Sequence, residues 1–307
     1  KENKNSLLNI EGFYKKNQNI YFKNILLKES ENNFKINGLS LNQNNKINYI
    51  EEVNLNFLND SKKENKILLK RNKKNYKLSG KIFDGTTLLD EILKSDSEGN
   101  IFNILNNFNS VVKISLNKIF VDDTNYLNNL NGSLKFNKSN LKSLDLKANF
   151  SNNKKLTFTV KTDQNNQKIT TLFSEYAKPL VKKYKFIKGF EEGYLDFYSV
   201  KKNNISSSNL KINDFKLNEL PALTKILTLA SLQGIADLLT GEGIRFNEFE
   251  MKFRNEKKLM TIDEIYAIGP AISIMMDGYV QKDELISLRG TLVPATTLNK
   301  IIGSLPL

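Results

Sequence analysis

The chain of 307 residues contains no cysteine, no histidine and no tryptophan. The missing cysteine and histidine exclude disulfide bonds, thiol nucleophiles, imidazole bases and the usual zinc ligands. Acidic residues do occur next to one another, for example in the pairs Glu191-Glu192 and Asp283-Glu284. Neighbouring side chains of a strand point to opposite faces, so these pairs are poorly placed for acid–base catalysis. We therefore expect a protein that is not an enzyme and that uses no catalytic residue, metal ion or cofactor.

Acidic residues are fewer than basic ones, 33 against 46, which gives a formal charge of +13. The excess is mostly lysine and accompanies many Asn and Ile residues, a composition that A/T-rich codons also produce. The paired lysines lie at 15–16, 62–63, 73–74, 154–155, 182–183, 201–202 and 257–258. Most of these pairs fall in expected turns, where they are either simply solvated or attracted to anionic lipid headgroups. Neither an RNA-binding aromatic motif nor an arginine-rich helix is present, so we expect no nucleic-acid partner.

Only one long stretch carries almost no charge, from Leu220 to Phe246. Its apolar residues recur with a helical period of 3.6 residues, and Pro221 suits a first helical turn. We expect Gly234 to separate two shorter helices, and Gly241 and Gly243 to end the second one. The pattern predicts helices near 221–240 that pack on a sheet, or that cap an apolar cavity. The length would suit a membrane-spanning helix, but Pro221, Gly234 and two charges between residues 220 and 240 count against one.

The rest of the chain consists mostly of about fifteen short segments that alternate apolar and polar residues. This alternation predicts a mainly β fold, an extended and curved antiparallel sheet that meanders as a groove, with a few short helices. Short helices are expected near 86–95, at 174–184 with an interruption at Pro179, and near 296–304.

Four sequence blocks between Gly189 and Leu307 carry a family resemblance. They are Leu220-Pro221-Ala222-Leu223, LASLQGIADLLTGEGIRF at 229–246, YAIGPAISIMMDG at 266–278 and LRGTLVPATTLNKIIGSLPL at 288–307. Their motif residues are Pro221, Gly234, Gly241, Gly243, Gly269, Pro270, Gly290, Pro294 and Asn299. In order and spacing these blocks resemble the C-terminal region of the AsmA-like proteins of Gram-negative bacteria, in particular the YhdP-type branch. Residues 76–93 resemble the region that precedes it.

The resemblance implies a protein on the periplasmic face of the inner membrane that carries phospholipid between inner and outer membranes. It divides the chain into a β-rich groove segment, 1–188, and an AsmA-like C-terminal region, 189–307. We expect the chain to be a segment of a longer protein whose flanking parts reach the membrane. Other envelope proteins are further expected partners.

The residue pattern agrees with lipid binding, because alternating apolar faces could line a trough for acyl chains. Each buried methylene contributes about 0.8 kcal/mol, so a chain of roughly 16 carbons would gain on the order of 10 kcal/mol. An exposed lysine–phosphate pair contributes only about 0–1 kcal/mol. The candidate lining residues are Leu156, Phe158, Val160, Leu195, Phe197, Leu210, Ile212, Leu217, Phe249, Met251 and Phe253.

Other interpretations stay open. Each candidate lining residue could belong to an ordinary core. The whole chain could be an envelope assembly module that binds protein and not lipid. A polysaccharide-acting enzyme is a third possibility, but it would need clustered carboxylates and aromatic platforms, and tryptophan is absent.

Overall fold

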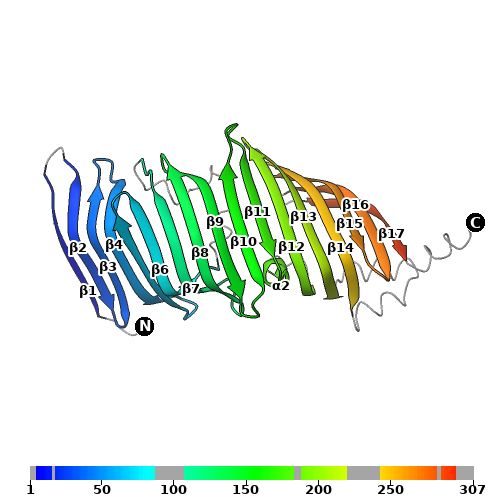
Figure 1. Ribbon diagram of the computed structural model, residues 1–307, viewed down its shortest axis with the longest axis horizontal. Helices are drawn as coiled ribbons and strands as arrows, with labels where there is room; N and C mark the ends of the chain where they lie inside the picture. Colours follow the sequence, from blue (N-terminus) through cyan, green and yellow to red (C-terminus); the bar gives the residue numbers. More distant parts are fainter. Residues whose placement is uncertain are drawn as a thin grey trace, which may run out of the picture. The chain divides into compact units, whose positions relative to one another are not determined.

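The computed structural model describes residues 5–15, 18–86, 107–182, 188–219, 243–281 and 285–294. The described residues form seventeen strands and one short helix, so the expected mainly β, mostly antiparallel fold is confirmed (Figure 1). The helices expected near 221–240 and 296–304 lie outside the described residues, as does the one near 86–95 apart from Thr86. The described part of the chain includes no helix with the length and hydropathy of a membrane span.

The chain divides into two compact units. Unit 1 comprises residues 1–153 and 158–161, and unit 2 comprises residues 154–157 and 162–307, so that β10 (Lys155–Thr162) contributes to both. The division after residue 188 concerns the family resemblance and stays a prediction.

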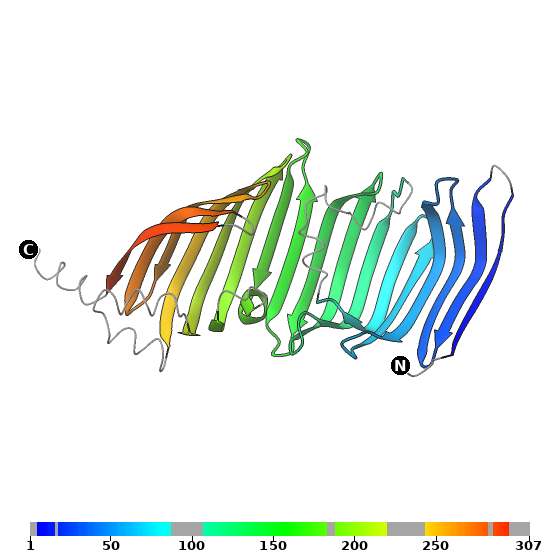
Figure 2. The ribbon, with the colours of Figure 1, turned by 180° about the vertical axis from the view of Figure 1, so that it is seen from behind.

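Unit 1 is a sheet in which consecutive strands lie side by side (Figures 1 and 2). Its complete strands are β1 (Ser6–Phe13), β2 (Ile20–Glu29), β3 (Asn32–Leu41), β4 (Ile47–Leu58), β5 (Glu64–Asn72), β6 (Asn75–Asp84), β7 (Val111–Phe120), β8 (Tyr126–Asn137) and β9 (Asn140–Phe150). All neighbouring pairs are antiparallel except β6 and β7, which are parallel. Antiparallel neighbours need only tight turns, whereas a parallel pair needs a longer connection, which here includes residues 87–106.

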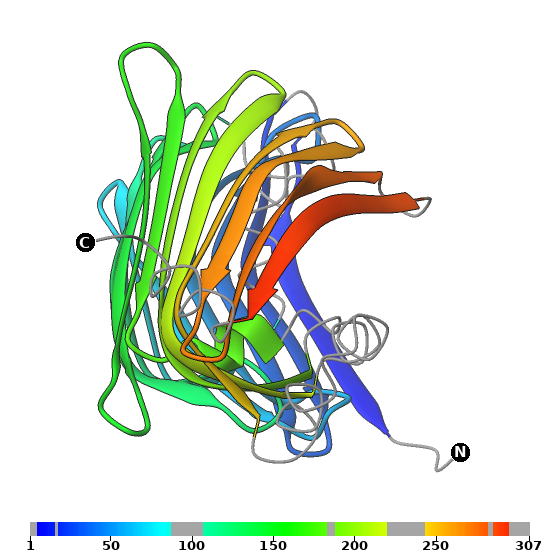
Figure 3. The ribbon, with the colours of Figure 1, turned by 90° about the vertical axis from the view of Figure 1, so that its right-hand side faces the viewer.

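Unit 2 continues the antiparallel meander from β11 to β17. Its strands are β11 (Lys168–Ser174), β12 (Lys188–Lys202), β13 (Ile205–Glu219), β14 (Ile244–Glu256), β15 (Leu259–Ile268), β16 (Ile272–Gln281) and β17 (Leu285–Pro294). The strands from β13 to β17 bend visibly along their length (Figure 3). The helix α2 (Lys178–Lys182) lies against β12, and the Ala177 amide donates a hydrogen bond to the Gly193 carbonyl at 2.8 Å. Pro179 lies in the first turn of α2, where proline is tolerated, and does not interrupt the helix as the sequence suggested.

A stack of three phenylalanines crosses the long strands of unit 2. The rings of Phe190, Phe215 and Phe246 follow one another at centroid distances of 5.2 and 5.3 Å, and their planes are nearly parallel. All three side chains are buried. Offset stacking of this kind adds to the free energy that burial already contributes. The stack is therefore a buried part of the core that the structure describes in unit 2.

Candidate functional site: apolar rows across the sheets

One apolar row crosses all nine complete strands of unit 1. Each member is the direct cross-strand partner of the next, and the row consists of Ile10, Ile25, Ile36, Val53, Leu69, Leu78, Ile114, Gly132 and Leu146. A second row beside it consists of Leu8, Leu27, Phe34, Leu55, Ile67, Gly80, Leu116 and Leu130. Directly opposite residues place their side chains on the same face of a sheet. No polar side chain interrupts either row.

Unit 2 has the same arrangement over seven strands. One row consists of Leu172, Phe197, Leu210, Met251, Ile265, Met276 and Gly290. The row beside it consists of Ser174, Leu195, Ile212, Phe249, Ala267, Ile274 and Leu292. Together these two rows form what we call the apolar band of unit 2. Gly290 lies within the band, and a Cβ there would collide with the Met275 carbonyl of the neighbouring strand.

The band is bordered by a row that changes from polar to apolar. This row contains Thr170, Ser199, Ser208, Phe253 and Ile262. The Ser208 hydroxyl donates a hydrogen bond to the Ser199 hydroxyl at 2.8 Å. Because the two buried hydroxyls satisfy each other, they do not disturb the apolar surface beside them.

Backbone irregularities keep the apolar side chains on one face where the alternation of the sequence breaks. In β13 the apolar positions change from Ile212 to Phe215, an odd separation that would normally reverse the face. Asp214 between them has a positive φ of 52°, and Gly193 on the neighbouring strand has a φ of 75°. The Phe215 ring still meets the Phe249 ring edge-on at 6.4 Å, so both lie on the same face. The Phe190–Phe215–Phe246 stack therefore extends the apolar band.

The structure brings together six of the eleven residues that the sequence proposed as groove lining. Leu195, Phe197, Leu210, Ile212, Phe249 and Met251 are neighbours in the apolar band of unit 2. Phe253 lies in the bordering row, and Leu217 pairs with Phe190 and Ile244. Leu156, Phe158 and Val160 are buried side chains of β10.

Exposure differs along the band. Leu195, Ile212 and Leu217 are buried, whereas Phe197, Leu210, Phe249, Met251 and Phe253 are half-buried. The half-buried members leave apolar surface that a ligand could cover.

The sequence reasoning missed the members of the band on β11, β15 and β16, such as Leu172, Ile265 and Met276. The alternation of residues 167–173, 258–268 and 271–281 could have found them. Among the motif residues, Gly243 has a φ of 82°, Gly269 and Pro270 begin the turn between β15 and β16, and Pro294 ends β17. Pro221, Gly234, Gly241 and Asn299 lie outside the described residues.

The opposite face of unit 2 is polar and charged. Lys252 lies 2.8 Å from Glu264, and Lys211 lies 3.2 Å from Glu250. Arg254 donates three hydrogen bonds to Asp263, at 2.6, 3.0 and 3.2 Å. These pairs join β13, β14 and β15. The sheet of unit 2 therefore has one apolar face and one solvated face, as the sequence alternation predicts.

Glu250 is the buried member of this polar face, only 5% exposed. Burial by itself raises the pKa of Glu250, but hydrogen bonds from Tyr266, Asn209 and Lys211 favour the ionised form. The bond lengths are 2.5 Å from Tyr266, 2.8 Å from Asn209 and 3.2 Å from Lys211. The net effect is a pKa of Glu250 below its ordinary value. The same hydrogen bond to Glu250 is the main cause that raises the pKa of Tyr266.

A lowered carboxylate pKa in the folded state predicts acid sensitivity. Its stabilising contribution is complete above the pKa of the unfolded chain, about 4.3, and is lost as the pH falls through the lower folded-state pKa. We expect the unfolding free energy of unit 2 to fall below about pH 4.5, and to fall less steeply in Glu250→Gln. Urea unfolding from pH 6 to pH 3 checks this, with the exposed Glu256→Gln as control. Equal pH slopes for the two variants would contradict the prediction.

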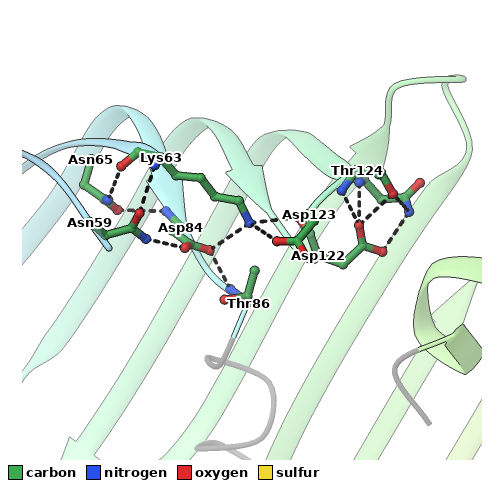
Figure 4. Close-up of polar contacts among 9 residues, drawn as sticks. Asn59, Lys63, Asn65, Asp84, Thr86, Asp122, Asp123 and Thr124 are labelled. Atoms are coloured by element: carbon green, nitrogen blue, oxygen red, sulfur yellow. Dashed lines mark hydrogen bonds and ion pairs between the residues drawn. The ribbon is translucent and has the colours of Figure 1, made fainter. Parts of the chain in front are cut away.

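A second polar cluster closes one edge of unit 1 (Figure 4). Lys63 Nζ lies 3.1 Å from Asp123 Oδ1 and 3.9 Å from Asp84 Oδ1, and it donates a hydrogen bond to the Asp122 carbonyl at 3.2 Å. Asn59 donates to Asp84 Oδ2 at 2.5 Å. The side chains of Lys63 and Asp84 are only 12% and 10% exposed. The cluster links the β4–β5 and β7–β8 turns to the end of β6. The buried charges of Lys63 and Asp84 have oppositely charged partners, and such pairing is what makes a buried charge tolerable.

The sequence reasoning did not single out this cluster, because its members come from three separate segments. The one local signal is the run Asp122-Asp123-Thr124-Asn125. The Asp122 carboxylate accepts the amide hydrogens of Thr124 and Asn125 at 2.6 and 2.7 Å, a tight polar turn. No group of acidic residues in the described part of the chain could hold a metal ion. Comparison with protein-family models, curated proteins and solved structures finds no match to this chain.

Proposed function

We propose that this chain binds the acyl chains of phospholipid along the apolar faces of its sheets. The observation that carries the proposal is the strict alignment of apolar residues, strand after strand, within each unit. An ordinary core also pairs apolar residues across strands, but it buries them, whereas most members of the first row of unit 1 are half-buried or exposed. Straight rows suit a ligand that is itself long, linear and apolar.

The dimensions support an extended ligand. Neighbouring strands lie about 4.8 Å apart, so the nine-strand row of unit 1 is about 38 Å long and the seven-strand row of unit 2 about 29 Å. Each row offers apolar contacts along most of its length, although its members differ in exposure. At about 0.8 kcal/mol per buried methylene, affinity comes from the total length covered and not from one deep site. A lipid could therefore shift along a row, because no single position holds it in a deep energy minimum.

The biological setting follows from the sequence resemblance. As a segment of an AsmA-like envelope protein, anchored in the inner membrane and exposed to the periplasm, the chain would help to move phospholipid between the inner and outer membranes. The resemblance of residues 189–307 supports this placement, and the apolar rows agree with the cargo. On this proposal the chain performs no chemistry on the lipid.

The alternative is an envelope assembly module that binds protein. All eight residues of β1 are exposed, and the adjacent Leu7 and Leu8, on opposite faces, are 58% and 59% exposed. Such a strand could be covered by a partner protein on both faces.

Lipid extraction and mass spectrometry of the purified chain separate the two functions. The lipid proposal predicts phospholipid in at least equimolar amount after purification without detergent. A chain that carries no phospholipid, but purifies with a stoichiometric partner protein, would support the assembly module instead. A chain stripped with detergent and then incubated with labelled phosphatidylethanolamine should regain the lipid.

A further inference from the structure

The turns of unit 1 are sorted by charge between the two edges of the sheet. One edge carries the turns β1–β2, β3–β4, β5–β6 and β8–β9. These turns contain Lys15, Lys46, Lys73, Lys74 and Lys138, and none of them contains an acidic residue. All five lysines are exposed, and within the described part of the chain none lies within ion-pair distance of a carboxylate. We call this the basic edge, the upper edge of the unit in Figure 1.

The other edge of unit 1 carries carboxylates. Glu31 lies in the turn β2–β3, Asp60 in β4–β5, Asp84 at the end of β6, and Asp122 and Asp123 in β7–β8. Lys62 and Lys63 lie there too, but the charge of Lys63 is compensated by Asp84 and Asp123. We call this the acidic edge.

The parallel pair β6–β7 is what keeps the charges sorted. In an antiparallel meander, successive turns alternate between the edges. If β6 and β7 were antiparallel, the turn with Asp122 and Asp123 would fall on the basic edge and Lys138 on the acidic edge. The parallel pairing shifts the alternation by one strand. The ion pair between Lys63 and Asp123 shows the result, because it joins turns that are both on the acidic edge.

Exposed aromatic rings lie on the basic edge as well. Phe13 and Tyr14, at the end of β1, are each 66% exposed, and the Phe13 ring lies 5.0 Å from that of Tyr21. Aromatic rings beside lysines are typical of surfaces that rest at the interface between membrane and water, where the rings reach the headgroup level.

We propose that the basic edge of unit 1 docks on an anionic bilayer surface, with the acidic edge turned away. Because the turns are two or three strands apart, they lie about 10–14 Å from one another, at least about one Debye length, so that lysines of different turns act almost independently on the headgroup charge. The turns supply lysines, which act as point charges, and no arginine, which would suit paired contacts to specific phosphates. This favours a surface of diffuse charge over a nucleic acid. The inference does not rest on lipid binding by the apolar rows.

Vesicle co-sedimentation tests the inference on the whole chain. The variant K46Q/K73Q/K74Q/K138Q removes four lysines of the basic edge, and K28Q/K62Q/K81Q/K147Q removes four exposed lysines from the other half of the unit. Both variants lose the same charge. Each lysine near an anionic surface contributes about fivefold in affinity. We therefore expect the first variant to lose at least about tenfold in binding to vesicles that contain one third phosphatidylglycerol, and the control variant less than about twofold.

The outcomes distinguish the possible partners. Equal losses in the two variants would show that only net charge matters and would overturn the inference, as would unchanged binding in the first variant. Tighter binding to a short DNA duplex than to vesicles, lost in the first variant, would assign the edge to nucleic acid instead. The first variant leaves the apolar band unaltered, so it is expected to carry as much bound phospholipid as the unaltered chain. Vesicle binding therefore tests the docking of the basic edge, and bound phospholipid tests the apolar rows, independently of each other.

Discussion

Replacement of Phe197 by glutamate is expected to lower phospholipid binding about a hundredfold. Phe197 lies within the apolar band, opposite Leu172 on one side and Leu210 on the other. The exchange removes a large half-buried apolar side chain and places a carboxylate where an acyl chain would exclude water. The combined cost of about 3 kcal/mol corresponds to that factor, because each 1.4 kcal/mol is tenfold in affinity.

The next residue provides a matched control. Tyr198 is also aromatic, lies on the same strand and points to the opposite face, where it is 48% exposed. Tyr198→Glu therefore introduces the same charge at the same height of the sheet without touching the band. Phospholipid per protein, measured by mass spectrometry and by reloading with labelled lipid, should fall only in Phe197→Glu. Equal lipid content in both variants would contradict the proposal that the apolar band binds the acyl chains.

The alternation of apolar residues was sufficient to predict the fold class and the two-faced strands. Residues 154–162 illustrate this, because Leu156, Phe158 and Val160 are all buried, as one face of a strand requires. The alignment of the rows was beyond the sequence, since it depends on register. Each register is set by turn lengths and by irregularities such as those at Glu11/Gly12 and Lys66/Ile67. One residue of slip in any pair would reverse the face of a whole strand.

Two further features escaped prediction for related reasons. Phe215 was left out of the candidate lining, and its odd separation from Ile212 breaks the simple alternation. Only the positive φ of Asp214 restores it to the same face. The parallel pairing of β6 and β7 was equally hidden, since hydrophobic patterns do not distinguish the directions of two partly buried strands. The charge sorting of the turns follows from that pairing and was therefore invisible as well.

Substitution of Phe246 by alanine is expected to destabilise unit 2 by about 3–5 kcal/mol. Phe246 is 2% exposed and is the direct partner of Phe215, whose ring stacks on it at 5.3 Å. The other two rings of the stack have little freedom to fill the space that the Phe246 ring leaves. The variant therefore loses both the burial and the stacking of this ring. A smaller cost would mean that the stack can collapse around the cavity.

The matched control is Phe173→Ala, a phenylalanine of the same unit whose side chain is 36% exposed. Its loss should cost less than about 1 kcal/mol, since most of the transfer free energy depends on burial. Hydrogen exchange of peptides from β13 and β14 measures the difference directly, because a cost of 3 kcal/mol accelerates exchange through global opening of unit 2 by more than about a hundredfold. Equal protection of these strands in the two variants would show that the stacked Phe246 contributes no more to stability than the exposed Phe173. The apolar band would then lack the rigid border against which a mobile lipid chain could be held.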